Sequence, residues 1–175
     1  CSDLLFPLVE TLISVDLVAG RPGDERGWDM EIQTTRFGNV NTKPGDILLF
    51  PSGLPGLKDS LHWVLLADAE NDSLGWLQSI SRPESALAVV NPRRFVKDYQ
   101  VRVSQREILP LQLKTPADAQ ALAIINKIGS ALTINLKAPL LFHLGQRLGH
   151  QVVVNDDQPL QHVISHQVSQ TRKSA

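Results

Sequence analysis

The chain has 175 residues, with 17 basic and 18 acidic side chains, a formal net charge of -1 and a single cysteine. This length suffices for one domain that folds without a disulfide or a structural metal, and the lone Cys1 excludes an internal disulfide and a cysteine-based zinc site. The balanced charge argues against a general nucleic-acid binder and a polybasic membrane anchor, and no apolar run approaches the ~20 residues that span a bilayer. We therefore expect a cytoplasmic protein that contacts neither nucleic acid nor membrane directly.

The beginning of the chain differs from the rest. An apolar stretch at 4–18 is interrupted by acidic residues and permits a short strand or helix, and a polar linker with glycine and proline follows at 21–27. The β-like pattern begins at Met30. We expect an N-terminal extension of uncertain origin at 1–29, a folded domain at 30–168 and a polar tail at 169–175.

From Met30 onward, short apolar or alternating runs are separated by turn residues, for example at 39–45. The clearest alternation is at Tyr99, Val101 and Val103, which is typical of a strand with one buried face. Strands at such short spacing favour an antiparallel barrel or sandwich, and alternating strand–helix units are missing. The expected strands are 31–35, 46–50, 63–67, 75–80, 86–90, 99–103, 121–125, 132–136, 140–144 and 151–154.

Two places predict a helix. Residues 104–107 fit a capping box, with Ser104 at the N-cap and Glu107 three positions later, and Pro110 then limits the helix. Residues 115–118 place a proline at the first helical position. We therefore expect an all-β fold, a small antiparallel β-barrel or sandwich with one or two short helices.

Patterns for catalysis or metal binding are weak. His162 and His166 lie four apart, a metal-binding spacing on a helix, but their segment is expected to be strand or tail. The acidic cluster at 68–72 lies in a turn and lacks the spacing of a calcium loop. We expect no enzymatic activity, no catalytic residue, no metal and no cofactor; a hydrolase built on His62 or His143 is the minor alternative.

Arg102 and Arg106 form an R-x-x-x-R pair, which resembles half of the cyclic-di-GMP motif of PilZ domains. Those domains carry a second element, D/N-x-S-x-x-G, after the first strand that follows. No such element occurs between Glu107 and Gly145. A small β-barrel that binds a nucleotide through these two arginines is therefore the alternative function.

Several motifs stand out that are not catalytic. They come in a fixed order: a Gly-Leu-Pro-Gly-Leu loop after an apolar run, Leu-Gln-Ser, Asn-Pro, and finally Asn-Leu-Lys-Ala-Pro. In this order and spacing they resemble the FliW family over roughly residues 30–166. The motifs are 53–57, 77–79, 91–92 and 135–139.

The resemblance implies a regulator that works by binding proteins. FliW proteins bind the RNA-binding translational regulator CsrA and relieve its repression of flagellin mRNA. They also bind flagellin, so that free flagellin competes for FliW. We also expect a protein that is monomeric by itself, and we expect the motifs to serve mainly fold and loop shape, with partner binding as a by-product. The residues expected to form this surface are Gly53, Leu54, Pro55, Gly56, Leu57, Gln78, Asn135, Lys137 and Pro139.

Overall fold

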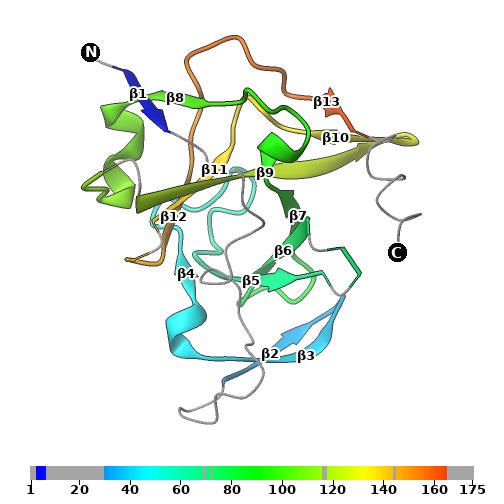
Figure 1. Ribbon diagram of the computed structural model, residues 1–175. Helices are drawn as coiled ribbons and strands as arrows, with labels where there is room; N and C mark the ends of the chain where they lie inside the picture. Colours follow the sequence, from blue (N-terminus) through cyan, green and yellow to red (C-terminus); the bar gives the residue numbers. More distant parts are fainter. Residues whose placement is uncertain are drawn as a thin grey trace.

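The computed structural model describes residues 3–6, 30–68, 70–71, 73–115, 118–143 and 145–164. This part of the chain consists of strands, short loops and three short 3-10 helices (Figure 1). None of its helices is long and apolar enough to cross a membrane. The strands are β1 (Asp3–Phe6), β2 (Met30–Thr34), β3 (Gly38–Thr42), β4 (Leu48–Leu49), β5 (His62–Ala67), β6 (Leu74–Ser79), β7 (Ala86–Val90), β8 (Val101–Ser104), β9 (Ala119–Ile128), β10 (Ala131–Ile134), β11 (Leu140–His143), β12 (Leu148–Gln151) and β13 (His162–Val163), and the helices are η1 (Pro44–Asp46), η2 (Pro92–Arg94) and η3 (Gln105–Leu111).

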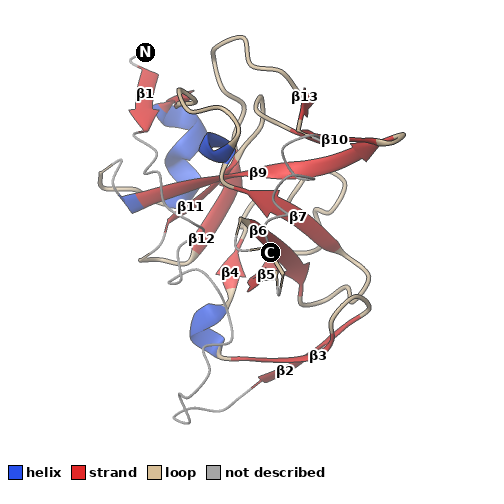
Figure 2. Cartoon of the chain, turned by 45° about the vertical axis from the view of Figure 1, so that its right-hand side comes forward, coloured by secondary structure: helices blue, strands red, loops and turns tan. Residues whose placement is uncertain are grey.

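Seven strands close into a barrel, in the order β4, β5, β6, β7, β9, β11, β12 and back to β4. Neighbouring strands in this ring are antiparallel except β12 and β4, which run parallel and meet at Leu148 and Leu49. β9 allows the closure because its first part pairs with β11 and its middle with β7. Its last part pairs with β10, which in turn pairs with β13. Figure 2 shows β9 as a long strand that crosses the molecule.

Large apolar side chains from alternate strand positions fill the barrel. Phe50 lies edge-on to Trp63, with 6.3 Å between ring centroids, and edge-on to Phe142 at 5.7 Å. All three side chains are fully buried. Burying a side chain of this kind contributes about 1.5–3 kcal/mol, so the aromatic cluster stabilises the ring of strands from within.

Two further layers pack on the outside of the barrel. The β2–β3 hairpin packs on β5, where Ile32 joins Val64 and Leu66 in one apolar cluster. On another face, β8 and η3 pack on β9, β11 and β12. Figure 1 shows the hairpin at the bottom of the view and β8 with its partner β1 at the top. The β1–β8 pairing joins residues 3–6 to the domain, whereas 7–29 lie outside the described residues.

The all-β fold predicted from the sequence is confirmed, and β7 begins and ends where expected. The strand expected at 121–125 is longer, because Asn126 and Lys127 continue it in the part that pairs with β10. Of the turn expected at 39–45, residues 39–42 instead belong to β3. Most of β3 is exposed, so its polar residues are compatible with a strand that covers the barrel from outside.

The strand expected at 151–154 lies three residues earlier, as β12. The N–H of Val152 still donates to the carbonyl of Pro139 at 3.1 Å. Proline has no N–H with which to return the second bond of this pair. The ladder therefore ends at Leu140 and Gln151.

The helix expected at 104–107 is η3. Ser104 is its N-cap, but the Ser104 side chain makes no capping hydrogen bond, so the predicted capping box is wrong in that detail. The helix ends just after Pro110, where Gln112 takes a left-handed conformation with φ of 52°. The other expected helix, at 115–118, includes two positions that lie outside the described residues.

Gly149 provides a test of the interior packing. A Cβ at this position would lie 2.7 and 2.8 Å from Cε2 and Cε1 of Phe50, whose ring is held between Trp63 and Phe142. We expect Gly149→Ala to lower the free energy of unfolding by about 1–3 kcal/mol, measured by urea denaturation. Gly145→Ala is the matched control, because its Cβ would come no closer than 3.7 Å to a His143 ring atom. Equal losses in the two variants would contradict this explanation.

Tyr99, the only tyrosine of the chain, reports on the apolar cluster that β8 and η3 form on the barrel. Its buried hydroxyl donates to the carbonyl of Leu136 at 2.7 Å. Burial raises the pKa of this phenol, and the nearby Asp156 raises it further. Because the unfolded chain ionises near pH 10, the stabilisation is complete below about pH 10 and is lost as the pH rises above it. We expect tyrosinate absorbance to rise only together with unfolding; ionisation near pH 10 with unchanged circular dichroism would contradict this.

Candidate functional site

Three of the four sequence motifs, 53–57, 77–79 and 135–139, lie in or beside loops at one end of the barrel, whereas the fourth, 91–92, follows the end of β7 at the opposite end. β4 and β12 run parallel and β11 is antiparallel to β12, so the end of β4 and the start of β11 lie at the same end. The antiparallel pairs from β4 to β7 place the end of β6 and the start of β7 there as well. Loop 50–61, loop 80–85 and segment 135–139 are therefore all attached to this end.

The loop at 53–57 is anchored at one side and exposed at the other. Gly53 has φ of 66°, and a Cβ there would lie 2.8 Å from the Lys58 Cα, so a side chain is excluded by backbone contact. Leu54 is buried in the barrel core, and its carbonyl accepts the N–H of Leu57 at 2.8 Å. Pro55 and the following glycine are exposed. The loop thus presents a rigid tip.

Gln78 is completely buried and holds the neighbouring loop. Its side-chain amide donates to the carbonyls of Ser79 at 2.9 Å and Pro83 at 3.2 Å. An ion pair between Arg82 and Asp59, at 3.6 Å, connects this loop to loop 50–61. Gln78 is therefore not part of the exposed surface itself, but it holds the neighbouring loop in place.

The motif at 135–139 is held by two side chains of its own. The Asn135 side-chain oxygen accepts the N–H groups of Lys137 and Ala138 at 3.1 and 2.9 Å, which closes a tight turn. The Lys137 ammonium donates to the carbonyls of Val154 and Asp156 at 2.9 and 2.8 Å. These residues, like the buried Pro139, give the segment a defined shape.

The sequence also offered an arginine pair and several histidines as alternative sites. Arg102 on β8 and Arg106 in η3 are both exposed. His143 is buried, and its Nδ1 lies 2.8 Å from the carbonyl oxygen of Leu111, a contact that positions the ring within the core. His62 is exposed at the start of β5. His166 lies outside the described residues, and the part of the chain that is described contains no cluster of three metal-ligating side chains.

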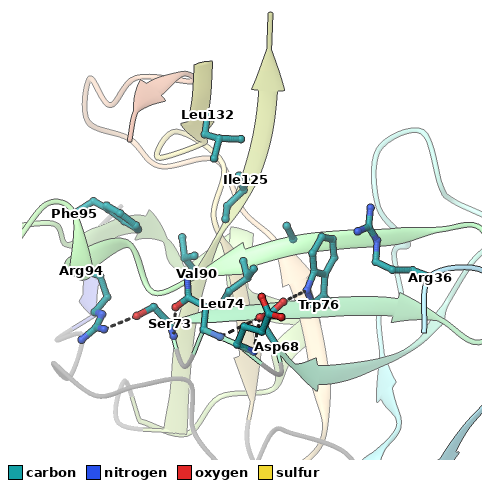
Figure 3. A pocket seen from close by; sticks show the side chains of 13 residues that line it. Arg36, Asp68, Ser73, Leu74, Trp76, Val90, Arg94, Phe95, Ile125 and Leu132 are labelled. Atoms are coloured by element: carbon teal, nitrogen blue, oxygen red, sulfur yellow. Dashed lines mark hydrogen bonds between the residues drawn. The ribbon is translucent and has the colours of Figure 1, made fainter. Parts of the chain in front are cut away.

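Sequence reasoning missed a pocket of about 540 Å³ on the outside of the barrel (Figure 3). Its floor is the outer face of β6, β7, β9 and β10, where Leu74 lies opposite Val90 and Trp76 opposite Ala88. A signal was available in β6, where the inward Leu77 follows the outward Leu74 and Trp76. A strand that is apolar on both faces has both faces covered or in use. The floor residues are Leu74, Trp76, Ala88, Val90, Ile125 and Leu132.

Trp76 is fixed from three sides. Its indole N–H donates to an Asp68 carboxylate oxygen at 3.0 Å. The Arg36 guanidinium lies 4.3 Å from the ring centroid, a cation–π contact of about 0.5–1 kcal/mol at an exposed site. Phe37 meets the ring edge-on, with 5.8 Å between centroids. These contacts hold the Trp76 ring in one orientation at the floor of the pocket.

The comparisons with known proteins agree with this fold. A family model described as FliW protein matches residues 31–164. The flagellar assembly factor FliW of Syntrophotalea carbinolica is 34% identical over 125 residues, which cover 71% of this chain and 89% of that protein. The flagellar assembly factor FliW of Ruminiclostridium cellulolyticum is 30% identical over 132 residues, which cover 74% and 89%.

A solved structure is similar as well. The crystal structure of a flagellar assembly factor FliW superposes with a TM-score of 0.71 at 26% identity, and the match covers 77% of this chain and 96% of that one. The family model, by comparison, spans nearly the whole described domain. This chain therefore belongs to the FliW family.

Proposed function

We propose that this protein is a flagellar assembly factor that binds two proteins in competition, the translational regulator CsrA and flagellin. The observation that carries the proposal is the family match over residues 31–164, supported by relatives that bear the name flagellar assembly factor. Binding to CsrA relieves the repression of flagellin mRNA, and free flagellin competes for the protein. It acts in the cytoplasm, without catalysis, and is a monomer until it meets a partner.

The charge of the chain supports a particular mode of action. The net charge is only -1, so the protein is not a polyanion and is poorly suited to imitate RNA. It instead holds CsrA in a state that has less affinity for RNA. Such a shift requires that it bind this state of CsrA more tightly than the RNA-binding state.

The motif loops supply the partner surface in this proposal. Pro55 and Gly56 make the contact, because they are exposed on a loop that Leu54 anchors in the core. The buried Gln78 and the segment 135–139 act by holding their loops in shape. A loop that is ordered before binding loses little conformational entropy on association.

Isothermal titration of the whole chain against CsrA and flagellin of the same organism tests the partner switch. We expect saturable binding to each protein and weaker binding to CsrA when flagellin is added first. No heat with either partner at about 50 μM protein would overturn the proposal, since even weak specific complexes are measurable there. Binding of cyclic-di-GMP in the same assay would instead support the nucleotide-binding alternative at Arg102 and Arg106.

Pro55→Asp tests the contact loop. The residue is exposed, so we expect the thermal unfolding midpoint to stay unchanged while the affinity for at least one partner falls about tenfold, or about 1.4 kcal/mol. Pro44→Asp is the matched control, because Pro44 is also exposed but precedes β4 at the other end of the barrel. Unchanged affinity of the Pro55 variant for both partners would exclude this loop tip from the interface.

A further inference from the structure

The pocket lies between the β2–β3 hairpin and the segment around η2. On one side, the turn of the β2–β3 hairpin contributes Arg36, which packs on Trp76 next to Phe37. On the other side, the end of η2 and the residue after it contribute Arg94 and Phe95. Between them, the outer faces of four strands leave an apolar floor. The pocket is therefore a gap in a sheet face that is covered on both sides.

The walls of this pocket are preformed. The Asp68 carboxylate accepts the Trp76 indole N–H and also the backbone N–H groups of Glu70 and Asn71, at 2.9 and 3.0 Å. These three hydrogen bonds hold the Asp68 carboxylate beside Trp76 and connect it to the backbone of the turn between β5 and β6. At the far side of this turn, the Arg94 guanidinium donates to the Ser73 hydroxyl. A ligand therefore meets a defined surface and pays little for ordering it.

The charges around the pocket have a pattern. Figure 3 shows Arg36 and Arg94 at opposite ends, with the apolar floor and Asp68 between them. Both guanidiniums are exposed and keep N–H donors beyond the single contact described for each. Glu70, in the turn beside Asp68, disfavours a further negative charge in the middle. A matching ligand is thus apolar in its middle and acidic at both ends.

We infer that this pocket docks a short segment of a partner protein, in which apolar side chains are flanked by acidic residues. The inference rests on the proposed function, under which the protein works by binding other proteins. The arrangement of the lining favours a peptide, because an extended segment places one acidic side chain beside each arginine and apolar side chains over the floor between them (Figure 3). Carboxylates pair with guanidiniums through paired hydrogen bonds, which also gives the segment a fixed orientation.

A synthetic peptide of about ten residues, ~33 Å when extended, tests the inference directly. It carries leucines in the middle and glutamates at both ends, and it is titrated into the nitrogen-15-labelled full chain to about 1 mM. Trp76 is one of three tryptophans, so its indole N–H signal is readily assigned and reports on the pocket. We expect this signal to shift with the acidic peptide and to stay in place with a peptide that has lysines at both ends.

Two kinds of variant locate the binding. Ala88→Phe fills the floor and is expected to weaken peptide binding at least about tenfold. Arg94→Glu reverses one rim charge and is expected to weaken peptide binding about fivefold, whereas Lys97→Glu, at an exposed position outside the pocket lining, leaves it unchanged. The rim variants lie on the surface, so they remain informative if Ala88→Phe does not fold. Binding that none of these changes affects would overturn the inference.

Other occupants give different results. A Trp76 signal that shifts with protein concentration alone would identify a second copy of this chain in the pocket and overturn the inference. Equal binding of the lysine-ended peptide would overturn the acidic pattern.

The same variants separate this inference from the proposed function. We expect Ala88→Phe to weaken binding to one of the two proposed partners. If the unmodified chain and Ala88→Phe bind both partners equally well, the function stands and the docking site is wrong. If the unmodified chain binds neither partner but takes the peptide in the pocket, the proposed function is wrong and the docking site stands.

Discussion

The backbone hydrogen bonds of β9 are divided among three partners, and the rest of the structure depends on this division. Its first residues pair with β11, its middle with β7 and its last residues with β10. Buried backbone groups must find hydrogen-bond partners. Where β9 leaves the barrel, β10 therefore takes over from the ring strands. The same crossing closes the barrel and creates the outer sheet face of β6, β7, β9 and β10 on which the pocket lies.

The motif loops have their shape from bonds between side chains and backbone. Asn135 closes one turn with its side-chain oxygen, Lys137 connects that turn to the chain after β12, and Gln78 holds the loop between β6 and β7. Such bonds replace the ladder bonds that loops lack. A buried motif residue such as Gln78 can therefore fix the shape of an exposed loop without being exposed itself.

The loop end of the barrel and the outer pocket are different kinds of surface. The loop tip at Pro55 and Gly56 is small and exposed, and its rigidity depends on Leu54 in the barrel core. The pocket is apolar and depends on Trp76, which the hairpin layer and the β5–β6 turn hold together. The two surfaces therefore rely on different layers of the core.

The sequence by itself determined the all-β class, the bounds of β7 and the family motifs with their loops, because alternation, turn residues and motif spacing are local properties. Only the tertiary structure decided the parallel contact of Leu148 with Leu49, the length of β9 and the end of β12 opposite Pro139. Each of these depends on which distant strand supplies the hydrogen-bond partner, and no local pattern encodes that. The pocket could not be predicted for the same reason. In the sequence, Trp76 and Ala88 are ordinary strand residues, and only the strand register places them side by side on an outer face.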